Sequence, residues 1–323
     1  MNDDCFRMGS FSWHCDNPFA LQPNQGCRLL MLILVYMAST FFLDQPALAQ
    51  DDSGLVSFYV SVFDKQGKPV EDLTQAKFEI LEDGKQQTIR SVHFEKATPV
   101  SLGILIDVSR SMGRERTDMA LSWVKSLAER LKSPDEIFIN SFSDDSQEVI
   151  DFAAPEDYLE EAATHLSTGG QSYTGLAVDR GLIKLRDSKN KKRVLLLVSA
   201  GLDKAGPATL EHIARFRCPI YALNLRGSGG ATGALDKLKS LSMKGTALKV
   251  YADQSGGNSV LVDSSNEAER ALDSLFYDLK NQYRLDYVSS NSKKDGKLRR
   301  VELKIMGGDY DMRYLRKYQA PRR

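Results

Sequence analysis

The chain has 323 residues, with 43 basic (Lys and Arg) and 43 acidic (Asp and Glu) side chains, and its formal net charge is zero. This balance argues against nucleic acid or another acidic polymer as the partner, because proteins that bind such polymers are usually basic. The length is sufficient for one large hydrophobic core and a second, smaller one.

An apolar run of 15 residues, LLMLILVYMASTFFL (29–43), lies near the start of the chain. Ala47 and Ala49 follow it in the small-x-small pattern of a signal-peptidase site. The sequence therefore predicts a signal peptide at residues 1–49, with a leading segment that is long for one, and an exported protein that is periplasmic or secreted. The alternative is an uncleaved segment that anchors the chain, although the run is shorter than the roughly 20 apolar residues of a membrane-spanning helix.

Residues 54–98 follow the period-two pattern of β-strands. The stretches LVSFYVSVFD, FEILED and QQTIRSVHFEK alternate apolar and polar residues, and DKQG and EDGK supply turns between them. We expect an N-terminal β segment here.

Residues 99–280 alternate short apolar strands with amphipathic helices. The strands are VSLGILID, EIFINSF, RVLLLVS and PIYALNL. In the first helix, TDMALSWVKSLAERLK, Trp123 and Leu127 fall on one face. This alternation is typical of a mainly parallel sheet covered on both faces, so we predict a doubly wound, Rossmann-like α/β domain.

Residues 281–323 return to the strand pattern in QYRLDYVS, KLRRVELKIM and DMRYLRKY. Each flank of about 45 residues is too small to bury much apolar surface alone. We therefore expect this C-terminal β segment to pair with residues 54–98 in a small β-sandwich-like domain. Its basic stretches KKDGKLRR and RYLRKYQAPRR are typical of solvated faces; near a membrane they would add affinity for anionic lipid.

The sequence contains no arrangement typical of an enzyme. Cys218 is the only cysteine after residue 50, so an exported form has no internal disulfide. His93, His165 and His212 lie far apart in the chain and fit no hydrolase or zinc motif. The glycine-rich stretch RGSGGATG (226–233) misses the spacing of a phosphate-binding loop. We therefore expect a protein without enzymatic activity.

The stretch LIDVSRSM places polar residues at alternate positions directly after a buried strand. Ligands of open α/β sheets bind beyond the carboxyl ends of the strands. If the loop is extended, Asp107, Ser109 and Ser111 face a common side, and their oxygen atoms suit Mg²⁺, Mn²⁺ or Ca²⁺. The alternative is that these residues cap the following helix without any metal.

These residues carry a resemblance to a known family. DVSRSM resembles the D-x-S-x-S motif of von Willebrand factor type A (VWFA) domains, which opens their metal-ion-dependent adhesion site (MIDAS). The stretch STGGQSYTGLAVDRGL resembles the second loop of that site, and RVLLLVSAGLD the third. The resemblance covers about residues 100–280. The β-rich flanks look like those of a bacterial subgroup of exported VWFA-related proteins.

The resemblance implies a set of metal ligands. Asp107, Ser109 and Ser111 match the first loop of the family directly. In the second loop, aligning the two glycines puts Ser172 at the position of the family's metal-binding Thr, with Thr174 as the neighbouring alternative.

The third loop departs from the family pattern. Ala200 stands where the family has an Asp, and alanine cannot bind a metal; Asp203 is a possible substitute from the same loop. We still expect a divalent ion, Mg²⁺ or else Mn²⁺ or Ca²⁺, held by a partly degenerate site.

The expected function is adhesion-type binding of a protein partner, through an acidic side chain that completes the coordination of the ion. Without metal, the same loops could bind a partner through Arg110, Arg114 and Tyr173. The competing hypothesis is a metal-independent structural or scaffold subunit of an envelope complex. We expect no nucleic acid and no small-molecule substrate, and membrane contact only if the N-terminal segment is retained.

Overall fold

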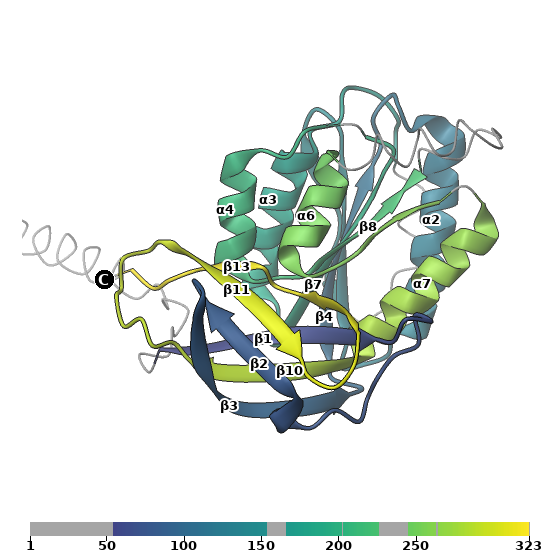
Figure 1. The fold of residues 1–323 in the computed structure, drawn as a ribbon. Helices are drawn as coiled ribbons and strands as arrows, with labels where there is room; N and C mark the ends of the chain where they lie inside the picture. The colour runs from purple at the N-terminus through teal and green to yellow at the C-terminus, as the bar shows by residue number, and fades with distance from the viewer. Residues whose placement is uncertain (1–53, 154–165, 202, 226–244, 263, 323) are drawn as a thin grey trace, which may run out of the picture. The chain divides into compact units, whose positions relative to one another are not determined.

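The computed structural model describes residues 54–153, 166–201, 203–225, 245–262 and 264–322. Within these residues the chain forms two β-sheets, one of them flanked by helices (Figure 1). The predicted signal peptide and the glycine-rich stretch 226–233 lie outside the described residues.

The first sheet has six strands in the order β6-β5-β4-β7-β8-β9. Its members are β4 (Val100–Asp107), β5 (Glu136–Phe142), β6 (Ser146–Ala153), β7 (Lys192–Ser199), β8 (Ile220–Asn224) and β9 (Ser259–Leu261). Neighbouring strands are parallel, except that β6 pairs antiparallel with β5. This arrangement confirms the predicted mainly parallel sheet, although the edge strand β6 was not predicted.

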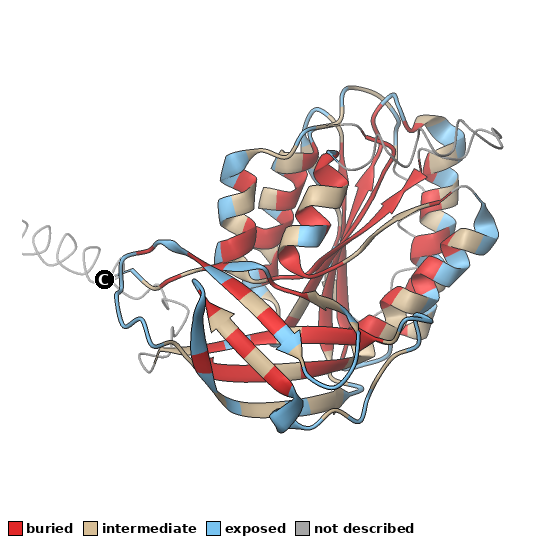
Figure 2. Ribbon diagram, viewed as in Figure 1, coloured by how far each residue is buried: buried red, intermediate tan, exposed pale blue. Residues whose placement is uncertain are grey.

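Helices cover both faces of this sheet (Figures 1 and 2). They are α2 (Gly113–Arg130), α3 (Thr174–Lys184), α4 (Pro207–Phe216), α6 (Ala247–Ser255) and α7 (Ser265–Lys280), and the 3₁₀ turn η3 (Leu185–Asp187) follows α3. Helices α2 and α7 pack on one face, and α3, α4 and α6 pack on the other. The structure is therefore the doubly wound α/β domain that the sequence predicts.

The central strand β4 is buried along its whole length. Strands of a parallel sheet that is covered on both faces read as continuous apolar runs, and VSLGILID is such a run. A Cβ atom at Gly103 would lie 2.4 Å from Cζ of Phe138 and 2.8 Å from Cδ1 of Leu195. The glycine therefore lets these two side chains pack directly against the backbone of β4.

The second sheet has seven antiparallel strands in the order β12-β1-β10-β3-β2-β11-β13. Its members are β1 (Leu55–Phe63), β2 (Phe78–Glu82), β3 (Lys85–Lys96), β10 (Asn281–Val288), β11 (Leu298–Ile305), β12 (Asp311–Tyr314) and β13 (Lys317–Gln319), and the 3₁₀ turn η1 (Gln75–Lys77) precedes β2. Strands from the two flanks are interleaved at one end of the sheet, where β10 lies between β1 and β3 and β1 lies between β12 and β10. The result is one curled sheet, since its edge strands β12 and β13 are separated by only two residues. Apolar side chains that include Phe58, Tyr283 and Leu303 form its core.

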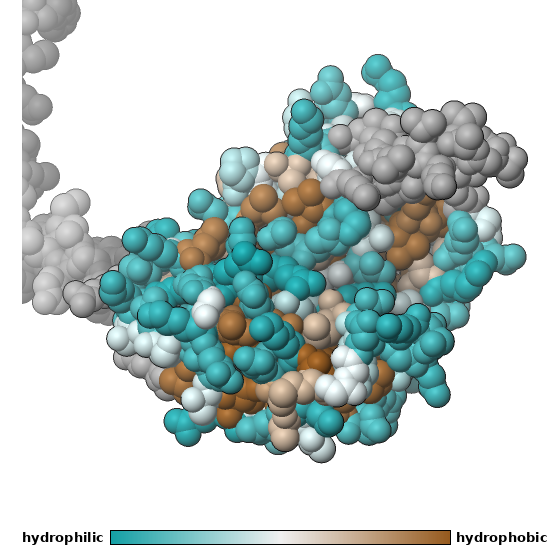
Figure 3. Space-filling model, in the orientation of Figure 1, coloured by the Kyte–Doolittle hydropathy of each residue, from teal (hydrophilic) through white to brown (hydrophobic). Residues whose placement is uncertain are grey.

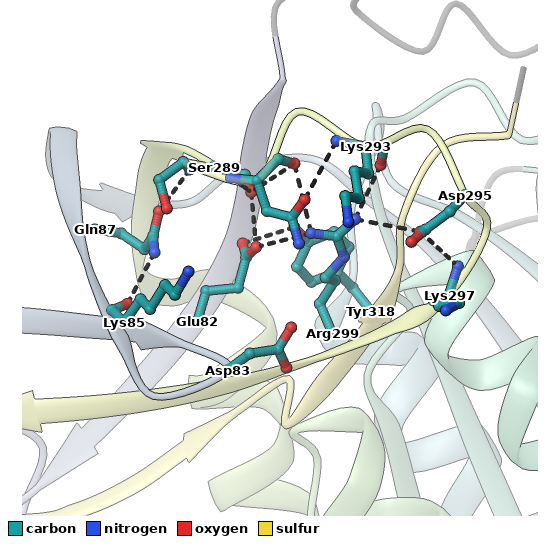
Figure 4. Close-up of polar contacts among 12 residues, drawn as sticks. Glu82, Asp83, Lys85, Gln87, Ser289, Lys293, Asp295, Lys297, Arg299 and Tyr318 are labelled. Carbon is teal, nitrogen blue, oxygen red and sulfur yellow. Dashed lines mark hydrogen bonds and ion pairs between the residues drawn. The ribbon is translucent and has the colours of Figure 1, made fainter.

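A buried carboxylate joins four strands of the curled sheet (Figure 4). Glu82, on β2, accepts hydrogen bonds of 2.7 Å from the hydroxyls of Tyr287, Ser289 and Tyr318. Arg299, on β11, is 3% exposed and lies 3.5 Å from the same carboxylate. These contacts connect β2, β10, β11 and β13 and neutralise a charge that burial would otherwise destabilise.

Replacing Glu82 by Gln should lower the free energy of unfolding by about 3 kcal/mol, because it removes the buried charge beside Arg299 and leaves that guanidinium only its contact with Asp295 (3.3 Å). Glu79→Gln, on the same strand, is the matched control, and we expect a loss below about 0.5 kcal/mol there. Urea unfolding measures both; equal losses in the two variants would contradict this account of the cluster.

The two sheets meet around Asp278, near the end of α7, which continues into β10 without an intervening residue. The Asp278 carboxylate is fully buried and accepts hydrogen bonds from Tyr221 Oη (3.1 Å) and Arg313 Nη1 (2.7 Å). Lys192, at the start of β7, is also buried, with its ammonium 4.8 Å from the centre of the Tyr59 ring. Burial lowers the pKa of Lys192 to about 7, and nearby carboxylates oppose only part of this effect.

Lys192 should make the stability of the chain depend on pH between about 7 and 10.5. In this window the unfolded chain holds the lysine proton and the folded chain does not, so the free energy of unfolding rises as the pH rises. Lys192→Met should remove that contribution and stabilise the protein at pH 6 by about 1–3 kcal/mol. Urea unfolding of both proteins from pH 6 to pH 10 measures the difference; a constant difference across the range would contradict the assignment.

Candidate functional site

The first loop of the candidate site begins at the carboxyl end of β4. Asp107 is the last residue of this strand and its side chain is fully buried. Its Oδ1 accepts a hydrogen bond from the backbone N–H of Ser109 (2.8 Å), which turns the chain directly after the strand. The hydroxyls of Ser109 and Ser111 lie 2.9 Å apart. The loop therefore groups the three residues that the sequence places at alternate positions.

The helix-capping alternative for these residues does not hold. Helix α2 begins at Gly113, its N-cap is Met112, and no side chain caps it. The Asp107 carboxylate binds the N–H of its own loop instead, so its position is not explained by the start of α2.

The second loop adds a hydroxyl to the same carboxylate. Ser172 Oγ donates to Oδ2 of Asp107 (3.0 Å) and lies 3.4 Å from Oγ1 of Thr174, the first residue of α3. Two backbone hydrogen bonds join the loops. The N–H of Gly169 donates to the carbonyl of Val108, and the N–H of Arg110 donates to the carbonyl of Gly170. In the second loop, Ser172 is thus the residue whose hydroxyl contacts Asp107 directly, and the Thr174 hydroxyl lies next to that of Ser172.

Gly170 is required by the geometry of the second loop. Its φ is +73°, which other residues rarely adopt. A Cβ atom there would lie 2.2 Å from Oδ2 of Asp144, whose Oδ1 accepts the N–H of Gln171 (2.9 Å). The glycine lets the loop lie against Asp144, in the turn between β5 and β6.

The third loop contributes a residue that sequence reasoning missed. Ser199, the last residue of β7, is fully buried; its hydroxyl donates to Asp107 Oδ2 and accepts the N–H of Gly201 (2.8 Å). Ile106 on β4 is paired with Val198 on β7, so the next residue of each strand, Asp107 and Ser199, also lie side by side. The sequence does show a polar residue at the end of the apolar strand β7. Its contact with Asp107 could not be predicted, because that contact depends on the register between β4 and β7.

The other two residues of the third loop face elsewhere. Ala200 follows Ser199, so its side chain points to the opposite side of the strand, where it packs in the apolar cluster with Val108 and Met112. Asp203 accepts the N–H of Thr174 (2.9 Å), at the start of α3. A carboxylate at a helix N-terminus is stabilised by the exposed amides and the helix dipole, so Asp203 has a structural role there.

The Asp107 carboxylate is buried, and its hydrogen-bond donors are N–H and hydroxyl groups. No Lys or Arg side chain within the described ranges forms an ion pair with Asp107, whereas buried carboxylates are usually paired with a cation or bound to a metal. In the same part of the chain, no three acidic, His or Cys side chains lie close enough to form a metal site by themselves. A cation at Asp107 would therefore depend on this single carboxylate and the surrounding hydroxyls.

The oxygen atoms present fit a hard divalent cation. Asp107 supplies the charge, and Ser109, Ser111 and Ser172 supply neutral oxygen donors, without any nitrogen or sulfur ligand. Oxygen-only sites of this kind suit Mg²⁺, Mn²⁺ or Ca²⁺.

The rim of the site carries exposed residues of mixed chemistry. Arg110 and Arg114 are exposed beside the first loop, with Arg114 only 3.8 Å from Asp118. Tyr173 and Leu176, at the start of α3, are among the exposed large apolar residues. A partner at this edge would meet positive charge and apolar surface together.

Removing the Ser199 hydroxyl should destabilise the whole cluster. Ser199→Ala deprives Asp107 of a donor and leaves the Gly201 N–H without its acceptor, so we expect a loss of about 1–3 kcal/mol in the free energy of unfolding. Ser111→Ala removes an exposed hydroxyl of the same site and should cost below about 0.5 kcal/mol. Denaturant unfolding compares them, and equal stability of the two variants would show that Ser199 does not support the site.

Comparison with known proteins gives one match to a family model. Residues 102–202 match the von Willebrand factor type A domain. This range includes the residues of all three loops up to residue 202. No curated protein matches the sequence.

Several solved structures are similar to the chain. One is a von Willebrand factor type A protein from Catenulispora acidiphila, with 13% identity, a TM-score of 0.43 and coverage of 84% of this chain and 75% of that chain. Another is the ArnB paralog VWA2 from Sulfolobus acidocaldarius, with 13% identity, a TM-score of 0.41 and coverage of 84% and 76%. A third is an aerotolerance-related membrane protein from Bacteroides fragilis, with 16% identity, a TM-score of 0.43 and coverage of 55% and 98%.

Proposed function

Because residues 102–202 are a von Willebrand factor type A domain, we propose that this chain is a non-enzymatic binding protein that recognises a partner protein at the carboxyl edge of the six-stranded sheet. Domains of this family generally mediate protein interactions and not catalysis. The observation that supports this edge as the binding site is the buried Asp107 carboxylate, which has hydroxyl donors around it and no basic partner among the described residues.

The proposed site includes a divalent cation, Mg²⁺ or else Mn²⁺ or Ca²⁺. Asp107, Ser109, Ser111 and Ser172 would hold it, with Thr174 behind Ser172. When bound, the ion supplies positive charge that an acidic side chain of the partner can bind. The hydrogen bonds to Asp107 hold the three loops together, and the exposed Arg110 and Tyr173 lie beside them.

The third loop makes the proposed site poorer in negative charge than the family pattern. Ala200 contributes no oxygen atom, and Asp203 is engaged at the start of α3. Fewer carboxylates weaken the hold on a cation, but they also leave more of its charge for the partner's carboxylate. We therefore expect weak metal binding combined with a preference for acidic partners.

A second candidate function rests on the same observations. Ser109 N–H, Ser172 Oγ and Ser199 Oγ already donate hydrogen bonds to Asp107, and such donors can stabilise a carboxylate without metal. In that case the chain is a metal-independent scaffold subunit, and the exposed Arg110, Arg114 and Tyr173 carry its partner contacts.

We propose that the protein is exported. The support is the apolar run at residues 29–43 and the following small-x-small pattern. None of the helices within the described residues is both long and apolar enough to cross a membrane.

Metal titration of the EDTA-stripped chain distinguishes the two functions. We expect Mg²⁺ and Mn²⁺ to raise the melting temperature saturably, since a ligand at 100 times its Kd stabilises the folded state by about 2.7 kcal/mol. Ser111→Ala should lower the affinity for the metal at least tenfold, because it removes one oxygen donor, and Ser111 itself is an exposed residue. Asp107→Asn should abolish the binding.

Ser122→Ala, an exposed serine of α2, is the control and should respond like the unaltered chain. If the unaltered chain shows no shift and no binding heat up to about 10 mM metal, far above the range of a working site, the scaffold function replaces the metal-dependent one.

A further inference from the structure

A second concave surface lies at the opposite end of the α/β domain from Asp107. It is an open cleft of about 740 Å³ between the turn that follows α6 and the strands β11, β12 and β13 of the curled sheet. The turn connects α6 to the start of β9, so the cleft lies toward the amino ends of the parallel strands. It is therefore separate from the proposed protein-binding edge.

The cleft exists because the curled sheet is not closed. Strands β11 and β12 follow one another in the chain, yet they are not paired, since β12 pairs with β1 and β11 pairs with β2 and β13. The N–H of Leu303 on β11 donates instead to the hydroxyl of Tyr314 on β12 (3.1 Å). An opening between the two strands remains on the outer surface.

The turn after α6 forms the other wall of the cleft. Gly256 has a φ of +86°, and a Cβ atom there would lie 2.4 Å from the carbonyl carbon of Tyr314. The backbone N–H of Arg316 donates to the carbonyl of Gln254 (3.3 Å). The turn thus lies directly against the backbone of the curled sheet and forms one wall of the cleft.

The cleft is rich in positive charge although the whole chain is neutral. Residues 281–323 contain 12 basic and 5 acidic side chains. Four of these basic residues line the cleft, and they are Arg300, Arg313, Arg316 and Lys317. Strongly hydrophilic surface gathers where α6 meets the curled sheet (Figure 3).

Two of the four basic residues of the cleft form ion pairs. Arg313 pairs with Asp278 (2.7 Å), and Arg300 pairs with Glu302 (3.2 Å). Arg316 and Lys317, by contrast, form no ion pair with any residue that the structure describes.

The two acidic residues of the cleft, Asp253 and Glu302, do not pair with Arg316 or Lys317. Asp253 pairs with Lys249, outside the cleft, and Glu302 is the partner of Arg300. Arg316 lies over the Tyr314 ring, 4.0 Å from its centre, and this cation–π contact limits the movement of the guanidinium. A guanidinium and an ammonium group that line the same cleft are suited to bind a multiply charged oxyanion.

We propose that this cleft binds a phosphate-bearing ligand through Arg316 and Lys317. Phosphate concentrates more than one negative charge on a small group, and the planar guanidinium donates two parallel hydrogen bonds to it. Asn258 lines the same cleft and offers a neutral amide donor. The phosphate belongs either to a soluble molecule or to the headgroup of an anionic lipid, which have the same chemistry at the cleft.

The test is calorimetric titration of the full chain with tripolyphosphate, in EDTA and low salt so that the result does not depend on the proposed metal site. We expect saturable binding that Arg316→Ala/Lys317→Ala weakens at least tenfold. Arg316→Lys keeps the positive charge but removes the paired N–H donors of the planar guanidinium, and should weaken tripolyphosphate binding severalfold. Lys125→Ala/Arg186→Ala is the control, because it removes the same charge from exposed positions outside the cleft.

Sedimentation with phosphatidylglycerol vesicles distinguishes the two sources of phosphate. Vesicle binding that requires Arg316 and Lys317 and is displaced by tripolyphosphate supports a lipid headgroup; tripolyphosphate binding without vesicle binding supports a soluble ligand. The proposal is overturned if tripolyphosphate does not bind, or if the cleft variant and the control variant lose affinity equally. The melting temperatures of all variants verify that they are folded.

Discussion

The carboxylate of Asp107 lies buried at the end of the central strand β4, and the hydrogen bonds that it accepts hold three separate loops together. Its donors are the Ser109 N–H from its own loop, the Ser172 hydroxyl from the second loop and the Ser199 hydroxyl from the end of β7. Parallel strands are what make this possible, because their carboxyl ends meet at one edge of the sheet. This arrangement positions the three loops relative to one another.

Two other buried carboxylates, Glu82 and Asp278, show how Asp107 differs from a carboxylate that lies beside a basic side chain. Glu82 lies beside Arg299, and Asp278 accepts a hydrogen bond from Arg313, so both have an opposite charge within the chain. Both also join elements of the structure, the strands of the curled sheet in one case and the two sheets in the other. Asp107 has hydrogen-bond donors but no basic partner among the described residues. Glu136 also forms no ion pair among the described residues, but it lies at the amino end of β5. We therefore assign binding to Asp107 because it lies at the carboxyl edge of the sheet, and stability to Glu82 and Asp278.

The sequence predicted those features that depend on local pattern. The run VSLGILID predicted a buried strand of a parallel sheet, and the alternate spacing of Asp107, Ser109 and Ser111 predicted that their side chains gather beyond it. The contribution of Ser199 was not predicted, because it depends on the register between β4 and β7, which no local pattern reveals. The curl of the second sheet and the opening between β11 and β12 were not predicted either. They result from pairing between strands more than 200 residues apart, as between β1 and β10.

The central claim is that Asp107 and the hydroxyls around it hold a divalent cation. Its most direct test is a crystal of the protein grown with Mn²⁺, examined for anomalous scattering from the metal. We predict an anomalous peak bounded by Asp107, Ser109, Ser111 and Ser172, which disappears in crystals of Asp107→Asn. A map without manganese at this position, with the Ser172 and Ser199 hydroxyls still donating to Asp107, would contradict the claim and leave a carboxylate that only holds the loops together.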